Sequence, residues 1–564
     1  MIPTPTSVLT NAEPESSTSF CSSRHQKSSE EQLRIAKEWN MSTGCSQAVW
    51  LLDVVPKSRA WMWSSPNGKV RPKSVSRVEA RNGDVTRPYH NAGLVLEDKL
   101  AKSQYQAPSN VDVPPATSFP VAFFLDIDAF RYRREVISVP FHPIPPEILS
   151  SLSDLDMNVH QIVAAYFSTI HSWMPFISKL RVQQIVTGNQ EFAPDFALLL
   201  LCMKVLVTNS AAESASMKTS LYRLAKHFYS TLEEAEIVTL RMLQSLVLLS
   251  LYEIGHGILP AAYFTVGNAA RMAQVVGIQS KDQSREVLGF SSTFSEAEER
   301  RRTWWSILIL DRFVLLGRLN QSCLIRNPSG DDSLPGETSS WDIGQATGNS
   351  AVFISSDVGV ITSPFARTCQ GANLLGRVLS HHEDKILEPT FRTAEATQLA
   401  QTTKALSRAL EYSILDTAVG ITSNFNNFME IAPSLALCYS SLFTLYKPYH
   451  CVGIFIARTS DEVALQEQAI NGIEDTSRQV LAFANQILAW ISSQDQISAI
   501  GPLVADCLYQ AGVVYARLVR ETGNRESYGG LSKIKTCLAR LSSRWCIASK
   551  YLAILEGQDK SPPC

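Results

Sequence analysis

The stretch SEAEERRRTWWSILILDRFVLLGR, residues 295–318, decides the fold. Its apolar side chains recur every three to four residues, so that Trp304, Leu308 and Leu315 form one ridge and a second ridge begins at Trp305. Together the two ridges are wider than the apolar stripe of an ordinary amphipathic helix. The stretch therefore predicts a helix that lies deep in the fold.

Charged side chains mark the start of this helix. Ser295 and Glu298 have the spacing of a capping box, in which each side chain accepts a backbone N–H of the first turn. Glu296 precedes Arg300 by four positions, and Glu298 precedes Arg302 by four. Each such pair contributes about 0.3–0.5 kcal/mol on a helix surface.

Two adjacent charges, Asp311 and Arg312, interrupt the apolar ridges. An unpaired charge at such a position would be costly. We predict that Asp311 bonds a cation of a neighbouring helix, preferably Arg271, which Gly267 and Ala270 would allow to approach closely. The alternative is that Asp311 pairs with Arg312 or with water at the rim of the fold.

Apolar residues at helical spacing continue from about residue 120 nearly to the end of the chain. Strand patterns and two-residue hairpin turns are nearly absent, which favours an all-α architecture. The interval 320–363 is rich in Ser, Gly, Asp and Asn and predicts a long irregular loop between two helical halves. The predicted helices cover residues 156–168, 194–207, 216–232, 237–254, 260–276, 295–316, 394–415, 433–446, 462–491, 501–520 and 531–555.

Composition separates the helical region from an amino-terminal region that is poor in large apolar side chains. Such a composition cannot offset the entropy of ordering. The predicted segments are a disordered Ser/Thr-rich tail at 1–30, a low-structure basic linker region at 31–119, a helical domain at 120–555 and a tail at 556–564.

The linker region carries a cluster of basic residues between several prolines. We name Lys69, Arg71, Lys73 and Arg77 the basic arm. One interpretation is a solvated tail, and the other is an arm that serves nuclear import or contacts phosphates.

Overall charge and cysteine usage limit the class of protein. With 51 Lys and Arg against 53 Asp and Glu, the net charge is −2, so any nucleic-acid contact must be local. The 11 cysteines are scattered without a CxxC pair, which suits a reducing compartment. No secretory signal is expected at the start, and the longest apolar run, 196–207, is too short for a membrane span and predicts a core helix.

Two polar clusters were weighed as sites for chemistry. Residues 381–384, HHED, would diverge around a helix and are interpreted as a solvated helix end. Asp331 and Asp332 are interpreted as a turn in an acidic loop, and Cys438, Cys451, Cys537 and Cys546 as buried packing. No nucleophile elbow, phosphate loop or HExxH motif occurs, so we expect no catalytic residues, no metal and no cofactor.

Several segments together resemble a known family. Residues 296–318 resemble the signature of the fungal-specific transcription factor domain, the middle homology region of fungal zinc-cluster regulators. LQSLVLLSLYEIGHG (243–257), AAYFTVGNAARMAQVVGI (261–278) and YFSTIHSWMPFISK (166–179) resemble its other helices in order, and the resemblance covers about 120–555. It implies structural roles for Arg271, Glu298, Arg301, Trp304, Trp305, Asp311, Arg312, Gly317 and Arg318.

The resemblance implies a helical regulatory domain, usually linked to an amino-terminal binuclear zinc cluster. That cluster holds two metals with six thiolates. Only Cys21 and Cys45 precede residue 120, so direct sequence-specific DNA binding does not carry over. DNA contact would be direct only if the zinc cluster is missing from this version of the sequence.

We therefore expect a nuclear regulator of transcription, including control of a metabolic or secondary-metabolite gene cluster, and not an enzyme. The implied partners are DNA, reached directly or through another protein, the transcription machinery or other regulators, and a second copy of the chain, with no membrane. The helix at 531–555 would serve that dimer or close the core, and we expect closure. The alternatives are a helical scaffold or apolar-ligand-binding protein without a DNA role, or a helical enzyme.

Overall fold

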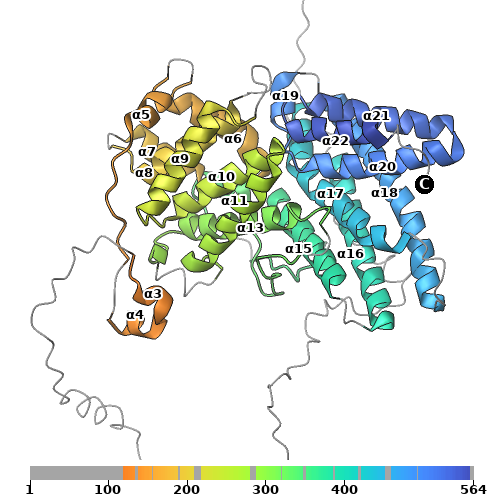
Figure 1. Ribbon diagram of the computed structural model, residues 1–564, viewed down its shortest axis with the longest axis horizontal. Helices are drawn as coiled ribbons and strands as arrows, with labels where there is room; N and C mark the ends of the chain where they lie inside the picture. Colours follow the sequence, from red (N-terminus) through yellow and green to blue (C-terminus); the bar gives the residue numbers. More distant parts are fainter. Residues whose placement is uncertain are drawn as a thin grey trace, which may run out of the picture. The chain divides into compact units, whose positions relative to one another are not determined.

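The ribbon in Figure 1 is a computed structural model of the chain. The structure describes residues 119–558, apart from 134–136, 155–156, 189–190, 209–216, 280–286, 319–320, 347–350, 358, 385–387, 417–420, 451–458 and 492. The predicted tail at 1–30, the basic arm, Cys21 and Cys45 all lie outside the described residues. What the sequence predicts for them stays a prediction.

The first half of the described chain, here called the amino-terminal half, is built from helices α3 to α13. Their bounds are α3 Ala122–Leu125, α4 Ile127–Arg133, α5 Pro146–Leu152, α6 Val159–Trp173, α7 Lys179–Thr187, α8 Pro194–Val207, α9 Ser220–Glu234, α10 Leu240–Gly255, α11 Leu259–Val276 and α13 Phe294–Phe313.

The second half, here called the carboxy-terminal half, begins after a loop that contains the short helix α14, Thr338–Asp342. Its helices are α15 Pro364–Glu383, α16 Pro389–Asp416, α17 Ile421–His450, α18 Ser460–Trp490, α19 Gln494–Ser498, α20 Val504–Thr522, α21 Arg525–Leu541 and α22 Cys546–Gln558. Within the described residues the only pairing of the strand type is an isolated bridge between Ser333 and Phe353. The predicted all-α class is confirmed.

Helix periodicity predicted most elements. The helix predicted at 194–207 has the bounds of α8, and the one predicted at 462–491 differs from α18 by two residues at the start and one at the end. Proline in the first turn starts α8, and Thr459 caps α18 with a full capping box. Helices α7 and α15 were not predicted. The single helix predicted at 531–555 is wrong, because the chain turns between α21 and α22.

Two hydrophobic cores lie side by side. The amino-terminal core is formed mainly by α5 to α13, with single residues from α17, α20 and α22, and the carboxy-terminal core mainly by α16 to α22. Helix α15 belongs to both, since Leu375 packs in the first core while Leu374 and Val378 pack in the second. It contacts α13 on one side and α16 and α17 on the other, as Figure 1 shows.

A second junction joins the end of α10 to the start of α22. Trp545 is fully buried there, and its indole N–H donates to Ile500 O at 2.6 Å. Its ring lies so close to Gly255 that an added Cβ would stand 2.3 Å from Trp545 Cε3. This close approach, together with the buried Arg544, explains why the chain cannot continue as one helix through 542–545.

The loop at 320–363 is irregular, as predicted, apart from α14 and the isolated bridge. Some of its apolar side chains are nevertheless buried, with Ile325 and Leu334 in the amino-terminal core and Trp341 also buried. The loop therefore supplies backbone N–H and C=O groups to the interior of the amino-terminal half.

Among the residues that the structure describes, one helix has the length and apolar composition of a membrane span. It is the part of α17 from Phe425 to His450, but 94% of its most apolar window is buried inside the fold. This burial identifies it as a core helix of the carboxy-terminal half.

Candidate functional site

Helix α13 begins one residue earlier than the sequence predicts. Thr293 is the cap, and its side chain accepts the N–H of Glu296 at 3.2 Å. The predicted capping box of Ser295 and Glu298 is therefore wrong. The predicted pair of Glu296 and Arg300 is present at 2.7 Å.

Glu298 is free for another role because Thr293 caps the helix. Its carboxylate accepts hydrogen bonds from three donors: Nε of Arg302 at 2.8 Å, the guanidinium of Arg301, and the backbone N–H of Gly336 at 2.7 Å. The predicted Glu298–Arg302 pair is thus present, but it is not on the surface: the two residues are 1% and 0% exposed. A buried ion pair of this kind is strongly destabilised when one partner is removed.

The Arg302 guanidinium joins α13 to the α6–α7 junction and to the loop at 320–363. It donates to Pro175 O at 3.1 Å, to Thr338 Oγ1 at 3.1 Å and to Gly336 O at 2.8 Å. Its centre also lies 4.3 Å from the Trp341 ring, a cation–π distance. Burial lowers the pKa of Arg302, and the Glu298 carboxylate opposes that shift.

Glu299, the next residue, fixes a different set of elements. Its carboxylate accepts the backbone N–H of Ser178 at 3.0 Å, Nη1 of Arg181 at 2.5 Å and Nε2 of Gln244 at 3.0 Å. These groups belong to the cap of α7, to α7 itself and to α10. One carboxylate of α13 therefore holds the ends of two other helices.

Asp311 does not pair with Arg271, so that prediction is wrong. Asp311 bonds Arg312 and accepts the backbone N–H groups of Leu324 and Ile325 at 3.3 and 3.1 Å. Arg271 instead donates to Gln274 near the surface. The reason is that the loop at 320–363 covers Asp311 and brings donors that helix spacing does not reveal. Burial raises the pKa of Asp311, against the effect of Arg312 and the two N–H groups.

Arg312 connects Asp311 to the carboxy-terminal half through hydrogen bonds. Its Nη2 donates to Asn327 Oδ1 at 3.0 Å, and the amide of Asn327 donates to Ser380 Oγ at 3.0 Å. Ser380 lies on α15. The end of α13, the loop and α15 are therefore joined through polar side chains.

The remaining positions of the family motif have simpler surroundings. Trp304 and Trp305 are buried with ring centroids 4.6 Å apart, and the indole of Trp305 donates to Ser333 O at 3.0 Å. Gly317 has a φ of +83°, which favours glycine where the chain leaves the helix. Arg318 is exposed and lies over the Tyr263 ring at 5.4 Å.

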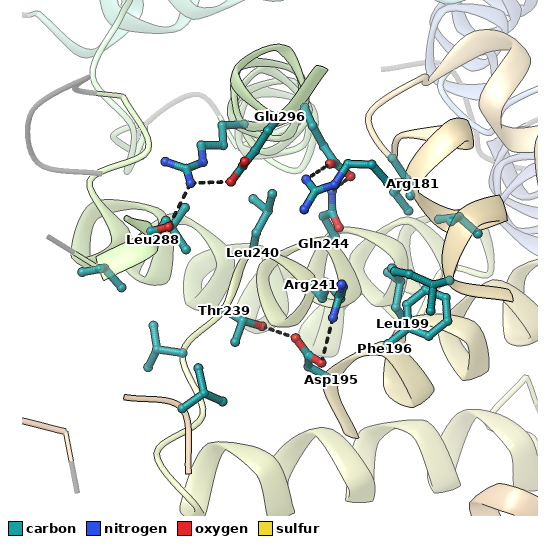
Figure 2. Close-up of a pocket in the computed structure, with 18 residues that line it drawn as sticks. Arg181, Asp195, Phe196, Leu199, Thr239, Leu240, Arg241, Gln244, Leu288 and Glu296 are labelled. Carbon is teal, nitrogen blue, oxygen red and sulfur yellow. Dashed lines mark hydrogen bonds and ion pairs between the residues drawn. The ribbon is translucent and has the colours of Figure 1, made fainter. Parts of the chain in front are cut away.

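Beside Glu299 lies a cavity of about 250 Å³, shown in Figure 2. In the figure the side chains of Thr239 and Arg241 both reach Asp195. The apolar part of the wall includes Phe196, Leu199 and Leu240. The complete lining is Val139, Ile177, Arg181, Val182, Ile185, Asp195, Phe196, Leu199, Val238, Thr239, Leu240, Arg241, Gln244, Val287, Leu288, Glu296, Glu299 and Arg300.

Three arginines line this cavity, each paired with a carboxylate. The charged atoms of Arg181 and Glu299 are 2.5 Å apart, those of Arg300 and Glu296 are 2.7 Å apart, and those of Arg241 and Asp195 are 3.3 Å apart. Burial acts to raise the pKa of Glu296, but hydrogen bonds from Arg300 and Ser292 outweigh it and hold the pKa below its usual value. Sequence spacing reveals only the Arg300 pair, because the other two join separate helices.

The HHED segment at 381–384 forms the end of α15, and its Glu383 and Asp384 are exposed, as interpreted, but the interpretation as a solvated end is wrong for the two histidines. His381 and His382 are buried where the end of α15 meets the end of α17. His381 bonds Glu395 at 2.6 Å and Tyr449 at 2.7 Å, and Nε2 of His382 lies 3.0 Å from Thr444 O. Burial, followed by the neighbouring His381, lowers the pKa of His382 to about 4.

The other polar groups that the sequence singled out are in the surroundings expected of them. The chain turns at 330–331, and Asp332 accepts the N–H of Ser329 at 2.9 Å. Cys438 and Cys537 are buried, Cys546 is partly buried, and Cys451 lies outside the described residues. Across the described part of the chain, no three His, Cys, Asp or Glu residues are placed to hold a metal ion.

Comparison with known proteins places this site inside a family domain. The model of the fungal specific transcription factor domain matches residues 163–370, which include α13 and nearly all of the cavity wall. Transcription factor BOA15 of Botryotinia fuckeliana is 38% identical over 185 residues, which are 32% of this chain and 98% of that protein.

Two further relatives are more distant. Transcription factor AN6788 of Emericella nidulans is 27% identical over 204 residues, 33% of this chain and 31% of that protein. The depudecin biosynthesis cluster-specific transcription activator DEP6 of Fusarium langsethiae is 24% identical over 160 residues, 26% of each chain. The chain thus spans nearly all of the first relative but less than a third of the other two.

Proposed function

Because this chain belongs to the family with a fungal specific transcription factor domain, we propose that it acts in the nucleus as a regulator of one biosynthetic gene cluster. Regulation of transcription follows from the family. Control of a biosynthetic cluster is supported by the relative DEP6, which is named as a cluster-specific activator. A nuclear location is what such regulation requires.

The observation that carries this proposal is the position of helix α13. Its charged side chains hold the α6–α7 junction through Arg302 and Glu299, the loop through Glu298, and α15 through Arg312 and Asn327. A change at one of these elements must be transmitted to the others, because a buried charge without its partner is costly. Such a hub suits a protein that changes state by rearranging packed helices.

We propose that the chain reaches DNA together with a partner protein. Cys21 and Cys45 cannot by themselves supply the six thiolates of a binuclear zinc cluster. The basic arm then supplies phosphate contacts that strengthen DNA association without reading sequence. A partner, or a second copy of the chain bound to one, would supply the reading of bases.

The proposal is tested by deleting the gene, restoring it with a tagged copy, and measuring chromatin occupancy and transcripts in the same cultures. We expect occupancy at promoters of one contiguous set of biosynthetic genes, with their transcripts changed in the deletion strain. Occupancy without a transcript change, or transcript changes scattered over the genome without occupancy, would contradict the proposal.

A matched pair of variants tests the basic arm. Replacing Lys69, Arg71, Lys73 and Arg77 by Gln should remove most nuclear accumulation and most promoter occupancy. The control replaces four exposed basic residues of the carboxy-terminal half by Gln, namely Arg478, Arg525, Lys533 and Arg540. Equal effects of the two sets would show that loss of charge alone, and not the arm, determines location.

A further inference from the structure

The cavity lies where the amino-terminal ends of four helices meet. Arg181 is in the first turn of α7, Asp195 in that of α8, Arg241 in that of α10, and Glu296 in that of α13. Each helix amino terminus carries a partial positive charge from its aligned peptide dipoles. Four such ends facing one cavity favour a ligand with negative charge.

Each oxygen of the three carboxylates at the cavity already accepts at least one hydrogen bond. Asp195 accepts from Arg241 and, at 2.9 Å, from Thr239. One oxygen of Glu296 accepts from Arg300, and the other accepts the N–H of Ser292 at 3.2 Å. Both oxygens of Glu299 are likewise engaged. Each carboxylate is thus already neutralised by an arginine, which disfavours a cationic ligand.

The arginines at the cavity, in contrast, have donors to spare. A guanidinium has five N–H donors, and among the described residues Arg181 and Arg241 each donate one of them, to Glu299 and Asp195. Both side chains are partly exposed to the cavity and to solvent. Arg300 is 6% exposed, and its buried Nε has no acceptor within the described structure.

Apart from Thr239 and Gln244, the rest of the wall is apolar. Phe196 lies under the Arg241 guanidinium at 5.3 Å, and Val182, Ile185 and Leu240 line the same space. The volume of about 250 Å³ is below the roughly 300–1,000 Å³ of pockets for drug-sized ligands. A fitting ligand is therefore small, with a compact apolar body.

We propose that this cavity binds a small organic monocarboxylate, with its carboxylate at Arg241 and Arg181 and its apolar body against Phe196, Val182 and Ile185. The inference rests on the proposed function, since it assigns the signal that the regulator receives. A carboxylate bound by the remaining donors of Arg181 shares that guanidinium with Glu299. Glu299 also holds the cap of α7 and Gln244 of α10, so occupancy of the cavity reaches α13 directly.

The test compares acids with their neutral amides on the purified full-length chain by titration calorimetry. The probes are phenylacetate with phenylacetamide and hexanoate with hexanamide. We expect at least one acid to bind saturably and at least about tenfold more tightly than its amide, as expected for hydrogen bonds to a charged group. Equal binding of acid and amide, or no saturable binding of either acid, would overturn the proposal.

Variants locate the binding. Arg241→Met should weaken acid binding about tenfold or more, whereas Arg478→Met, which removes an exposed arginine paired with Asp475 far along the chain, should leave it unchanged. Ile185→Trp keeps every charge but fills the cavity, so it should abolish binding and serves if Arg241→Met does not fold. Unchanged binding in a folded Arg241→Met or Ile185→Trp protein would place the acid elsewhere and refute the site.

These measurements are independent of gene control. If the acids fail to bind while the promoters remain occupied, the proposed ligand class is wrong and the proposed regulation of transcription is kept. If the acids bind as expected and no promoter is occupied, the site stands and the proposed regulation fails.

Discussion

Buried charged side chains gather in the amino-terminal half, whereas the carboxy-terminal half brings its helices together at glycines. On α13, Glu298, Glu299, Arg302 and Arg312 are all buried. In the carboxy-terminal half the contacts are of a different kind: an added Cβ on Gly472 would stand 2.4 Å from Tyr446, and on Gly530 2.7 Å from Tyr515.

The two designs differ in what can alter them. Ion pairs specify one arrangement but can exchange partners when a ligand or a proton arrives. A close contact at glycine depends on shape alone and has no charged partner to exchange. We therefore expect a ligand or a proton to alter the contacts of the amino-terminal half more readily than those of the carboxy-terminal half, and the following changes test the two kinds of contact.

The largest effect is expected in the amino-terminal half for Arg302→Gln. This change leaves the Glu298 carboxylate buried beside a neutral group and removes three hydrogen bonds that join separate segments. We expect a loss of about 3–5 kcal/mol, measured as a lower midpoint of urea unfolding. Arg301→Gln is the control, because Arg301 bonds the same carboxylate but is 30% exposed, and it should cost less than about 1 kcal/mol. Similar losses for both variants would show that burial of the pair does not matter.

A smaller effect is expected in the carboxy-terminal half for Gly472→Ala. The new methyl group would collide with the Tyr446 ring, and overpacking of this kind costs about 1–3 kcal/mol, partly offset by the better helix propensity of alanine. Gly529→Ala on α21 has nothing within 4 Å of its new Cβ and should stabilise by about 0.5–1 kcal/mol. Thermal unfolding of the two variants measures the difference. If both substitutions raise the midpoint, or both lower it, the close contact between Gly472 and Tyr446 is not what determines stability.

The next prediction concerns His256, at the α10–α22 junction between the halves. Its ring lies 4.3 Å from Tyr252 and 5.6 Å from Trp545, and neither ring nitrogen has a partner in the described structure. Burial, with the nearby cations Arg544 and Lys550, lowers its pKa to about 3. Between about pH 6.5 and 3 the unfolded chain therefore binds a proton that the folded chain does not.

The free energy of unfolding should accordingly fall as the pH falls through that window. His256 accounts for a loss of about 2 kcal/mol at pH 5. His256→Phe keeps the ring contacts and should remove this loss of stability. The unfolding midpoint should then depend less steeply on pH. His160→Gln, at an exposed position of α6, is the control and should leave the profile of the parent protein. A pH profile of His256→Phe that matches the parent would place the acid sensitivity in other groups.

The fold could be predicted from sequence wherever burial follows helical periodicity. Helix α8 was bounded correctly because its run of large apolar residues starts at a proline. Helix α15 was missed because it buries polar side chains such as Thr368 and Asn373, so its pattern does not look like a core helix. Thr368 finds its partner in Ser434 of α17, 66 positions away, at 2.8 Å.

The site was predictable only where its partners lie one helical turn apart. Spacing of four predicted the Glu296–Arg300 and Glu298–Arg302 pairs. It could not show that Glu298 is buried, since burial comes from Gly336 in a loop that has no periodicity. The cavity was not predicted either, because Arg181 and Arg241 come from helices with no sequence relation to α13.

The smallest effect should be the coupling between Asp311 and Arg271, the pair that helix spacing favoured. Asp311 is held by Arg312 and by backbone N–H groups of the loop, while Arg271 lies at the surface with Gln274. In a double-mutant cycle, Asp311→Asn and Arg271→Gln should therefore be additive within about 0.3–0.5 kcal/mol.

The matched cycle replaces Arg271→Gln by Asn327→Ala, because Asn327 joins the same network through Arg312 and Ser380. This second pair should couple by about 0.5 kcal/mol or more. Such a result means that α13 acts on the carboxy-terminal half through the loop, and that helix α11 takes no part in this link. Coupling to Arg271 and none to Asn327 would reverse that path and place the contact between α11 and α13 at the centre of the amino-terminal half.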